Sequence, residues 1–518
     1  MQLALALADR FQAALIGVAG LALRPAFVAG GVVVYCHPTE HECRAARARL
    51  EDMGKKFRAQ GQHLKQVEWR TALELPYELV SREARAADLV IVGARHTGGN
   101  MQDLADPGVI LLRAGRPVLV VPDTVAPLQP RRVVVAWKDT RECRRAVRDA
   151  LPFLQRAKEV LLVGIGEGEA ESNAKRTLSD AAGYLLRHRV AAVHDVWRQA
   201  RGPVAAELLR LVQEEGADLI VAGGYGAVDW GNGSLAASRM SFLHRVRSVA
   251  CCRTEHSVVL VACGRTLMPS GDVARSIGVV IDQGKQEDPM SLAALMVHVD
   301  VEHDSEQRVE LAIGLANRFQ TTLIGVAGCA LWPAFMAGDV GLTKSSQYDF
   351  QKVMVRFEQR GKKFHAQGRS LRQIEWRSAL ETPRELLLRE VRAADLLIIG
   401  RKRSENDADP GVIVLRAGRP VLLVPDTVAA LPLRRVVVAW KDTRESRRAV
   451  RDALPFLQEA KEVVLVEVGE HESQSQAKKN LADVAAAIRW SWRPKSGADR
   501  GAWSLQSSCA SCRRKRQI

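Results

Sequence analysis

The chain has 518 residues and a formal net charge of +16. With 47% hydrophobic and 26% charged residues it has the composition of a globular protein, which argues against disordered, collagen-like and coiled-coil classes. Its apolar runs are too short to span a bilayer, and Asp9 and Arg10 interrupt the apolar N-terminal stretch, so we expect no membrane segment and no signal peptide. Nine irregularly spaced cysteines are typical of reduced thiols, which predicts a cytoplasmic location.

An apolar strand, RPVLVVP at 116–122, closes the first segment of the chain. The next segment opens with a continuous β-branched run at 133–135, which is typical of a strand buried on both faces. Asp139 and Thr140 then supply helix N-cap chemistry. Apolar spacing along this segment predicts strands and helices in alternation at 133–135, 143–154, 160–165, 174–188, 190–197, 203–215 and 218–224.

The same plan returns further along the chain. Residues 107–164 reappear at 410–467 with 49 of 58 positions identical at an offset of 303. A repeat of this length indicates a duplicated two-domain unit and not a solenoid. In the second copy, strands are expected at 295–299, 322–327, 371–376, 395–400 and 421–424, and helices at 305–318, 348–367 and 383–392. Such alternation predicts parallel sheets covered by helices on both faces.

Three segments resemble the universal stress protein family: the opening strand with AWKDTRE at 136–142 and 439–445, the block AELLRLVQEEGADLIVAGGYG at 206–226, and the closing RPVLVVP strand. The resemblance covers most of the chain outside 227–289 and 489–518. It implies an α/β fold with a doubly wound, Rossmann-like, five-stranded parallel sheet of order 3-2-1-4-5, repeated in tandem. It also implies an intracellular stress-response protein, and some family members bind ATP.

On this resemblance we expect six segments. They are a domain at 1–127 that lacks its first strand, a domain at 128–256 with an aberrant C-terminal third, a linker at 257–289, a complete domain at 290–430, a truncated domain at 431–488, and a basic irregular tail at 489–518.

The resemblance also implies where a nucleotide would bind, at the carboxyl ends of the first and fourth strands. The family's acidic position after the first strand is matched by Asp300 and, one place displaced, by Asp139 and Asp442. The hydroxyl position after it holds Thr140 and Thr443, and Gly223 with Gly226 satisfies the first part of a Gly-x2-Gly-x9-Gly-Ser/Thr loop.

The rest of that loop pattern is missing. Nine residues after Gly226 the chain has Ala236 where the family has glycine, and no single domain holds both halves of the site. ATP is therefore the possible cofactor that the resemblance implies, while the incomplete pattern argues against its binding to this chain.

Other chemistry has weaker support. His37, His41 and Cys43 have metal-ligand spacing but are not repeated in the second copy, and Cys509 with Cys512 lacks a second pair, so no metal site is expected. The basic tail is typical of a solvated segment, which argues against nucleic-acid binding. No nucleophile, base and orienting group converge, and no catalytic residue is assigned.

The sequence leaves three functional hypotheses. The first is a non-catalytic binding and signalling protein of tandem universal stress domains, in which the fifth strands (Val118–Val121 and Val421–Val424) pair through their edges in self-association. The second is a nucleotide hydrolase on the same fold, which would depend on Asp300. The third is a frame-shifted fusion without function, because the family pattern breaks after Gly226 and after Ile488.

Overall fold

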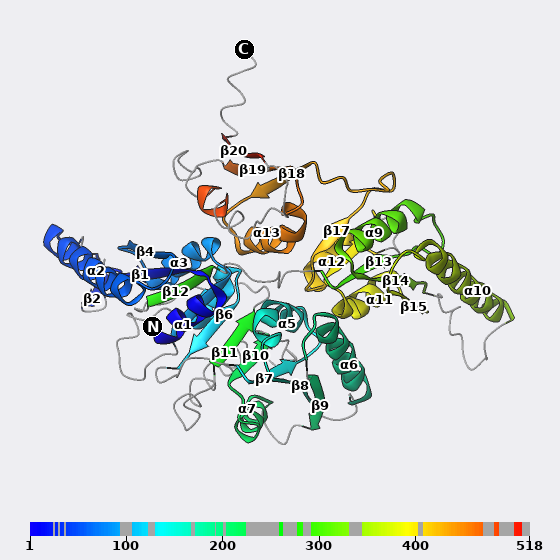
Figure 1. Cartoon of the computed structure of the whole chain (residues 1–518), viewed down its shortest axis with the longest axis horizontal. Coiled ribbons are helices and arrows are strands. Elements are labelled where there is room, and N and C mark those ends of the chain that lie inside the picture. Colours follow the sequence, from blue (N-terminus) through cyan, green and yellow to red (C-terminus); the bar gives the residue numbers. More distant parts are fainter. Residues whose placement is uncertain are drawn as a thin grey trace, which may run out of the picture.

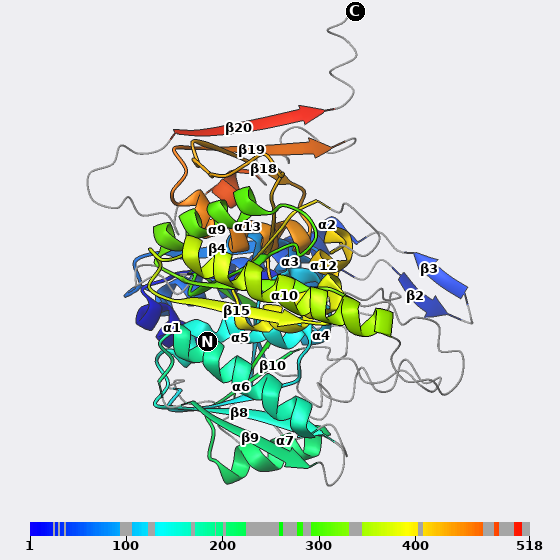
Figure 2. The same ribbon diagram turned by 90° about the vertical axis from the view of Figure 1, so that its right-hand side faces the viewer.

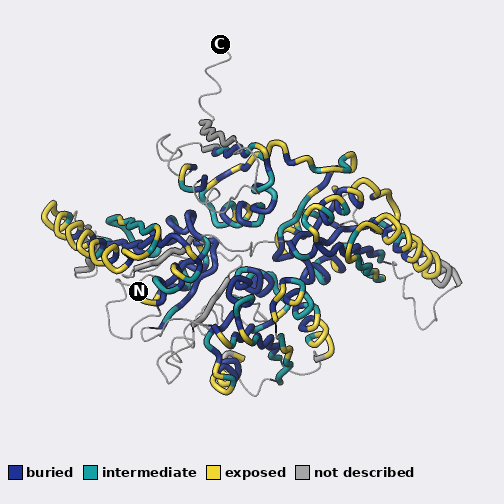
Figure 3. Tube along the Cα trace, viewed as in Figure 1, coloured by how far each residue is buried: buried dark blue, intermediate teal, exposed yellow. Residues whose placement is uncertain are grey.

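A computed structural model describes the chain at residues 1–23, 26–29, 32–35, 38–93, 106–122, 130–166, 171–191, 193–199, 204–223, 258–262, 277–282, 292–330, 344–401, 408–469, 481–485 and 502–509. Four α/β lobes surround a common centre (Figure 1). Strands and inner helices are buried, whereas the long helices α2 (Glu40–Gln60) and α10 (Lys344–Gln367) carry the most exposed outer faces (Figure 3).

The first unit holds two of the lobes. The elements of its first half are α1 (Gln2–Phe11), β1 (Ala14–Gly20), β2 (Ala26–Ala29), β3 (Val32–Tyr35), α2, β4 (Val67–Ala72), α3 (Pro76–Glu83), η1 (Ala84–Ala86), β5 (Leu89–Gly93), α4 (Pro107–Ala114) and β6 (Val118–Val121). Those of its second half are β7 (Arg132–Trp137), α5 (Arg141–Leu154), β8 (Glu159–Gly166), α6 (Glu171–Arg187), β9 (Val193–Gln199), α7 (Val204–Glu214) and β10 (Leu219–Gly223).

The second unit repeats these elements. Its first half has β13 (Ala294–His298), α9 (Glu306–Phe319), β14 (Thr322–Gly328), α10, β15 (Ile374–Ala379), α11 (Pro383–Glu390), η3 (Val391–Ala393), β16 (Leu396–Ile399), α12 (Pro410–Arg416) and β17 (Val421–Leu423). Its second half has β18 (Arg435–Trp440), α13 (Arg444–Leu457), β19 (Glu462–Gly469) and a helical piece at 481–485. The strands and helices predicted from periodicity are confirmed, with shifts of a few residues at their ends.

The α/β class with parallel strands is confirmed. In residues 290–430 all strand pairs are parallel, in the order β15-β14-β13-β16-β17, so the first strand is central. Two apolar clusters cover the two faces of this sheet, one under α9 and α10 and the other under α11 and α12. The three inner strands, β14, β13 and β16, are therefore buried on both sides, as their largely apolar sequences require.

The first unit departs from this plan, because one ten-stranded sheet joins its two halves in the order β4-β1-β12-β5-β6-β11-β10-β7-β8-β9. The segment 257–289, expected as a linker, contributes β11 (Val258–Ala262) and β12 (Ile277–Asp282). β12 lies antiparallel between β1 and β5, at the central place that β13 takes in residues 290–430. The expectation of purely parallel pairing is wrong for this sheet.

The edge of β6 is paired inside the chain. β11 lies parallel to β10 and antiparallel to β6, with Val259 opposite Val120, so it joins the two half-unit sheets. In the second unit, β17 ends its sheet in the part of the chain that is described, and β18 ends a separate sheet of order β18-β19-β20. β20 (Ala502–Cys509) comes from the segment expected as an irregular tail (Figure 2).

The two halves of each unit pack against one another in the same way. Phe11 on α1 meets Phe153 on α5 edge to face, with ring centroids 5.3 Å apart. Phe319 on α9 meets Phe456 on α13 in the same manner, at 5.5 Å. The two units thus share this contact between their first and second halves, although only the first unit joins its halves in one sheet.

Candidate functional site

The predicted hydroxyl residues cap helices. Thr140 Oγ1 accepts a hydrogen bond from the amide of Cys143 at 3.3 Å, and Thr443 Oγ1 accepts one from the amide of Ser446 at 3.3 Å. Each threonine is thereby the N-cap of its helix, α5 or α13, and satisfies one of the free amides of the first turn. Both side chains already have a structural role at the strand ends.

The acidic residues beside them make ion pairs within and between domains. Asp139 receives Nε of Arg144 at 2.8 Å from its own domain and Nη1 of Arg392 at 3.0 Å from the second unit. Asp442 receives Nε of Arg447 at 2.9 Å and, across the molecule, Nη1 of Arg85 at 3.2 Å. The two carboxylates therefore hold domains together at the place where the resemblance puts a nucleotide contact.

Gly223 ends β10 against the first turn of α5. A Cβ atom at this position would lie 2.7 Å from the amide nitrogen of Cys143 and 2.9 Å from its Sγ. Only glycine permits this close approach of strand and helix. Asp139, Thr140 and Gly223 thus lie at one strand edge, whereas Gly226 lies outside the described residues.

Asp300 lies apart from these residues, in the turn after β13. Its Oδ1 accepts hydrogen bonds from the amides of Glu302 and His303, both at 2.9 Å, and its Oδ2 is 3.3 Å from Nδ1 of His303. Burial raises the pKa of Asp300, but the two amide donors and the nearby histidines outweigh it, so the pKa is lower than usual. A carboxylate is thereby held ionised at the carboxyl edge of the central strand.

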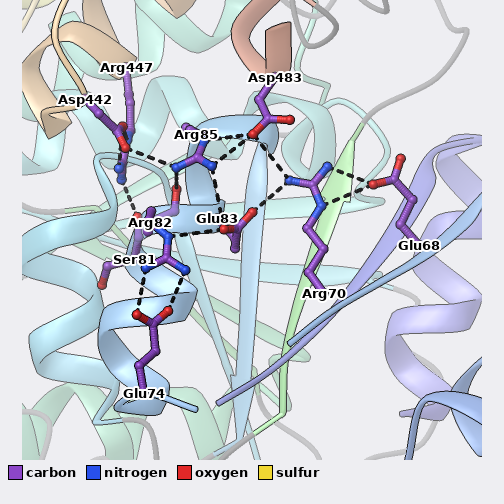
Figure 4. A network of polar contacts seen from close by, with 10 residues as sticks. All are labelled: Glu68, Arg70, Glu74, Ser81, Arg82, Glu83, Arg85, Asp442, Arg447 and Asp483. Carbon is purple, nitrogen blue, oxygen red and sulfur yellow. Dashed lines mark hydrogen bonds and ion pairs between the residues drawn. The ribbon is translucent and has the colours of Figure 1, made fainter. Parts of the chain in front are cut away.

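The strongest polar arrangement was not predicted, and it centres on Arg85 (Figure 4). The Arg85 side chain is 1% exposed, although it carries a charge. Its Nε and Nη2 donate to Asp483 Oδ2 at 3.0 and 2.9 Å, while Nη1 donates to Asp442. On its own domain, Glu83 lies 3.7 Å away and also receives Arg70 at 2.8 Å. A buried guanidinium is stable only when paired in this way.

The same arrangement occurs a second time around Arg392, also 1% exposed. Its Nε donates to Asp180 Oδ2 at 2.8 Å, and its Nη1 donates to Asp139. Glu390 receives Arg377 at 2.7 Å, as Glu83 receives Arg70. We call the two sets the Arg85 network (Arg70, Glu83, Arg85, Asp442, Arg447, Asp483) and the Arg392 network (Asp139, Arg144, Asp180, Arg377, Glu390, Arg392).

The two networks are related by exchange of the units. The Arg85 network joins the first half of unit one to the second half of unit two, and the Arg392 network joins the first half of unit two to the second half of unit one. Between them, α5 and α13 meet through Arg148 with Asp452 at 3.0 Å and through Arg451 with Asp149 at 3.4 Å. Reciprocal contacts of this kind are the mark of two-fold symmetry, here within one chain.

A signal for these residues is present in the sequence. Arg85 and Arg392 occupy matching positions at the upstream offset of 307, and Asp180 and Asp483 match at the offset of 303. Each lies in a helical stretch beside apolar residues, where an unpaired charge would be costly. Charges retained in both copies at such positions indicate a shared partner, but the sequence does not say that this partner belongs to the other unit.

On the Arg392 side, the described residues include a further buried polar cluster. Asp395 Oδ1 accepts from the hydroxyl of Tyr184 at 2.7 Å and is 2.9 Å from Nε2 of His188, while its Oδ2 accepts from two backbone amides at the start of β13. Arg419 Nη1 donates to the Tyr184 hydroxyl at 3.2 Å. Burial raises the pKa of Tyr184, so its hydroxyl remains protonated and serves as a donor, not as a nucleophile.

The described residues were compared with the requirements of a metal site and of a membrane-spanning helix. Within the described ranges, no group of three or more His, Cys, Asp and Glu side chains could hold a metal ion. His37 and the side chains of Cys509 and Cys512 fall outside those ranges, so these predictions are not addressed. Of the helices that the structure describes, none combines the length and apolar character needed to cross a membrane.

Comparison with known proteins gives structural likenesses at low identity. No family model and no curated protein matches the chain. A universal stress protein from Archaeoglobus fulgidus is similar over 47% of this chain and 85% of its own, at 16% identity and a TM-score of 0.32. A universal stress protein from Pseudomonas aeruginosa, described as putative, is similar over 57% and 94%, at 16% identity and a TM-score of 0.19. An Anabaena protein solved with UDP and glucose is similar over 70% and 95%, at 15% identity and a TM-score of 0.17.

Proposed function

We propose that the chain is a cytoplasmic stress-response protein of tandem universal stress domains, which acts by binding and signalling and not by turnover. Residues 128–256 and 431–488 serve as assembly domains, and residues 290–430 carry the capacity for residual adenine-nucleotide binding. The observation that carries this division is the different use of the acidic residues after the first strands.

In the assembly domains, these acidic residues are committed to other domains. Asp139 binds Arg392, and Asp442 binds Arg85, in each case through a guanidinium that is 1% exposed. A ribose or phosphate contact at either carboxylate would have to displace a buried cation. The removal of one partner from a buried pair costs several kcal/mol, about 3–5. We therefore assign no ligand to these two strand ends.

Asp300 is used differently, because its polar contacts among the described residues lie in its own turn. Its domain has the first strand at the centre and the fourth strand beside it, and in a doubly wound sheet ligands bind where strand order reverses between these two. Gly400 follows β16, the fourth strand, and lies against the side chain of Arg308. These features support 290–430 as the nucleotide-binding domain.

The proposal is tested by thermal unfolding of the full chain with ATP and Mg²⁺. A ligand that binds only the folded state raises Tm as its concentration exceeds Kd. We expect a rise for the wild type and for the control Glu302→Gln, whose side chain is exposed, but none for Asp300→Asn. No rise in the wild type, or an equal rise in Asp300→Asn, would contradict the proposed nucleotide site.

Phosphate release measured on the same samples separates binding from turnover. We expect release from ATP to stay at the level of the buffer for all three proteins. Steady release that disappears in Asp300→Ala would instead support the hydrolase hypothesis.

A further inference from the structure

The strands β7 and β18 have the same sequence, RVVVAW, but different neighbours. Each pairs in parallel with the second strand of its domain in the same register, Arg132 with Glu159 and Arg435 with Glu462. On its other edge β7 pairs with β10, whereas β18 is the last strand of its sheet in the part of the chain that is described. One of two identical strands therefore has an open edge.

The exposed fractions of matching valines in β7 and β18 differ in the same way. Val134 in β7 is 0% exposed and belongs to an apolar cluster with Leu208 and Leu211 of α7 and Ile220 of β10. Its counterpart in β18, Val437, is 61% exposed. The sequence around the two valines is the same, so the difference arises from the layer formed by α7 and β10, which covers β7 and has no counterpart on β18 among the described residues.

The neighbouring half-domain is open at the corresponding surface. Val120 of β6 is 7% exposed and Leu111 of α4 is 2% exposed, in the same cluster as α7. Their counterparts Leu423 in β17 and Val414 in α12 are 49% and 53% exposed. In the first unit, β11 lies on β6 and β10 lies on β7, so two strands bridge the half-domains.

The two units share the arrangement that frames this surface. The edge-to-face contact of α1 with α5 is repeated between α9 and α13. β17 and β18 belong to separate sheets, so the comparison with β7 concerns the edge of β18 alone. In the first unit this place is filled by one strand and one covering helix, β10 and α7.

We propose that the open edge of β18 is a docking site for a helix–strand segment of another polypeptide, with the chemistry of α7 and β10. The partner segment has an amphipathic helix followed by an apolar strand that aligns parallel to β18. An open strand offers a row of amides and carbonyls, which only another strand satisfies in full, and the exposed side chains beside it are aliphatic.

The pairing of β10 with β7 predicts the register in which a partner strand would dock on β18. In the first unit, Leu219 lies opposite Val133 and Ala222 lies opposite Ala136. The same strand of a partner would place its first apolar residue opposite Val436 and its last opposite Ala439. This inference does not depend on nucleotide binding.

The test is binding of a fluorescent synthetic peptide of residues 203–223 to the full-length chain, followed by anisotropy. We expect saturable binding to the wild type and at least about tenfold weaker binding to Val437→Glu. Val437 is largely exposed, so this variant keeps the urea midpoint of the wild type. A peptide with proline in place of Ile220 and Val221 loses ladder donors and is expected not to bind.

Three results would overturn the proposal. They are absence of peptide binding to the wild type, equal binding to Val437→Glu, and equal binding of the proline peptide. A further overturning result could come from sedimentation of the chain alone. A dimer that Val437→Glu abolishes would show that a second copy occupies the edge, and that the assignment to a helix–strand partner is wrong.

Discussion

The Arg85 and Arg392 networks show what duplication preserves and what it loses. Each buries one arginine between a glutamate of its own domain and two aspartates of the other unit, with donor–acceptor distances that differ by no more than a few tenths of an ångström. Among the described residues, the Arg392 side adds the cluster of Tyr184, His188 and Asp395. At the offset of 303, the positions of Tyr184 and His188 hold Ala487 and Ser491, outside the described residues.

The difference separates two kinds of contact. An ion-pair network that fixes domain geometry needs few residues, and both copies retain them. The additional buried hydrogen bonds depend on a complete helix α6, and the second unit follows a different sequence after Ile488. We therefore expect the Arg392 side to be the more stable of the two interfaces, and the following predictions test this comparison from the largest effect to the smallest.

Loss of the central arginine is expected to have the largest effect. Arg392→Met and Arg85→Met each remove the buried cation shared by two aspartates, of which Asp139 and Asp442 keep Arg144 and Arg447. We expect a loss of about 2–4 kcal/mol in the free energy of unfolding, measured by urea denaturation. Arg58→Met, which removes an exposed ion pair with Glu51, is the control and is expected to change stability by less than about 0.5 kcal/mol. Equal effects for all three would show that the networks do not hold the domains.

The buried carboxylate of Asp395 should make the stability of the wild type depend more steeply on acid pH than that of Asp395→Asn. Burial raises the pKa of Asp395, but His188 and nearby arginines lower it by more than burial raises it. The folded-state pKa therefore lies well below the unfolded value. Its contribution to stability is complete above about pH 5 and declines as pH falls below about 4. Urea midpoints between pH 3 and pH 7 should therefore fall less steeply for Asp395→Asn than for the wild type. Parallel pH profiles would refute the ion-pair account.

The two identical strands give a matched pair of core substitutions. Val134→Ala removes fully buried methyl groups, and we expect a loss of about 1–2 kcal/mol. Val437→Ala changes a largely exposed side chain, and we expect less than about 0.5 kcal/mol. A similar loss for both, measured by urea denaturation, would mean that Val437 is buried in solution and that the edge of β18 is covered.

The smallest expected effect should be the same in both units. Thr140→Ala and Thr443→Ala each remove one N-cap hydrogen bond of the same length, so each should cost about 1 kcal/mol. Thr140→Ser and Thr443→Ser retain the hydroxyl and serve as controls. A clear difference between the two alanine variants would show that the caps differ in solution, in contrast to the geometry seen here.

Local elements could be predicted from the sequence because their causes are local. The β-branched run of β7, the apolar spacing of α5 and the cap at Thr140 each rest on neighbouring residues, and all three predictions are confirmed. The place of β12 could not be predicted, since a short apolar strand at 277–282 carries no mark of the distant gap between β1 and β5. Pairing between segments far apart depends on the whole fold.

The candidate site shows the same division. The position of Asp139, Thr140 and Gly223 at one strand edge follows from parallel topology, and the sequence predicts it. Their partners could not be predicted, because Arg392 lies 253 residues away from Asp139 and reaches it only through the crosswise packing of the units. A sequence motif states which residues are near a strand end, not which domain covers them.

The crosswise pairing of the units is tested most directly by a double-mutant cycle on Arg392 and Asp180, which belong to different units and are joined at 2.8 Å. The full chain, Arg392→Met, Asp180→Asn and the double variant are compared by urea denaturation at pH 7. We predict a coupling energy of at least about 1 kcal/mol, so that the double variant is more stable than the sum of the two losses implies. Additive losses, with a coupling energy near zero, would contradict the pairing of the two units through this network.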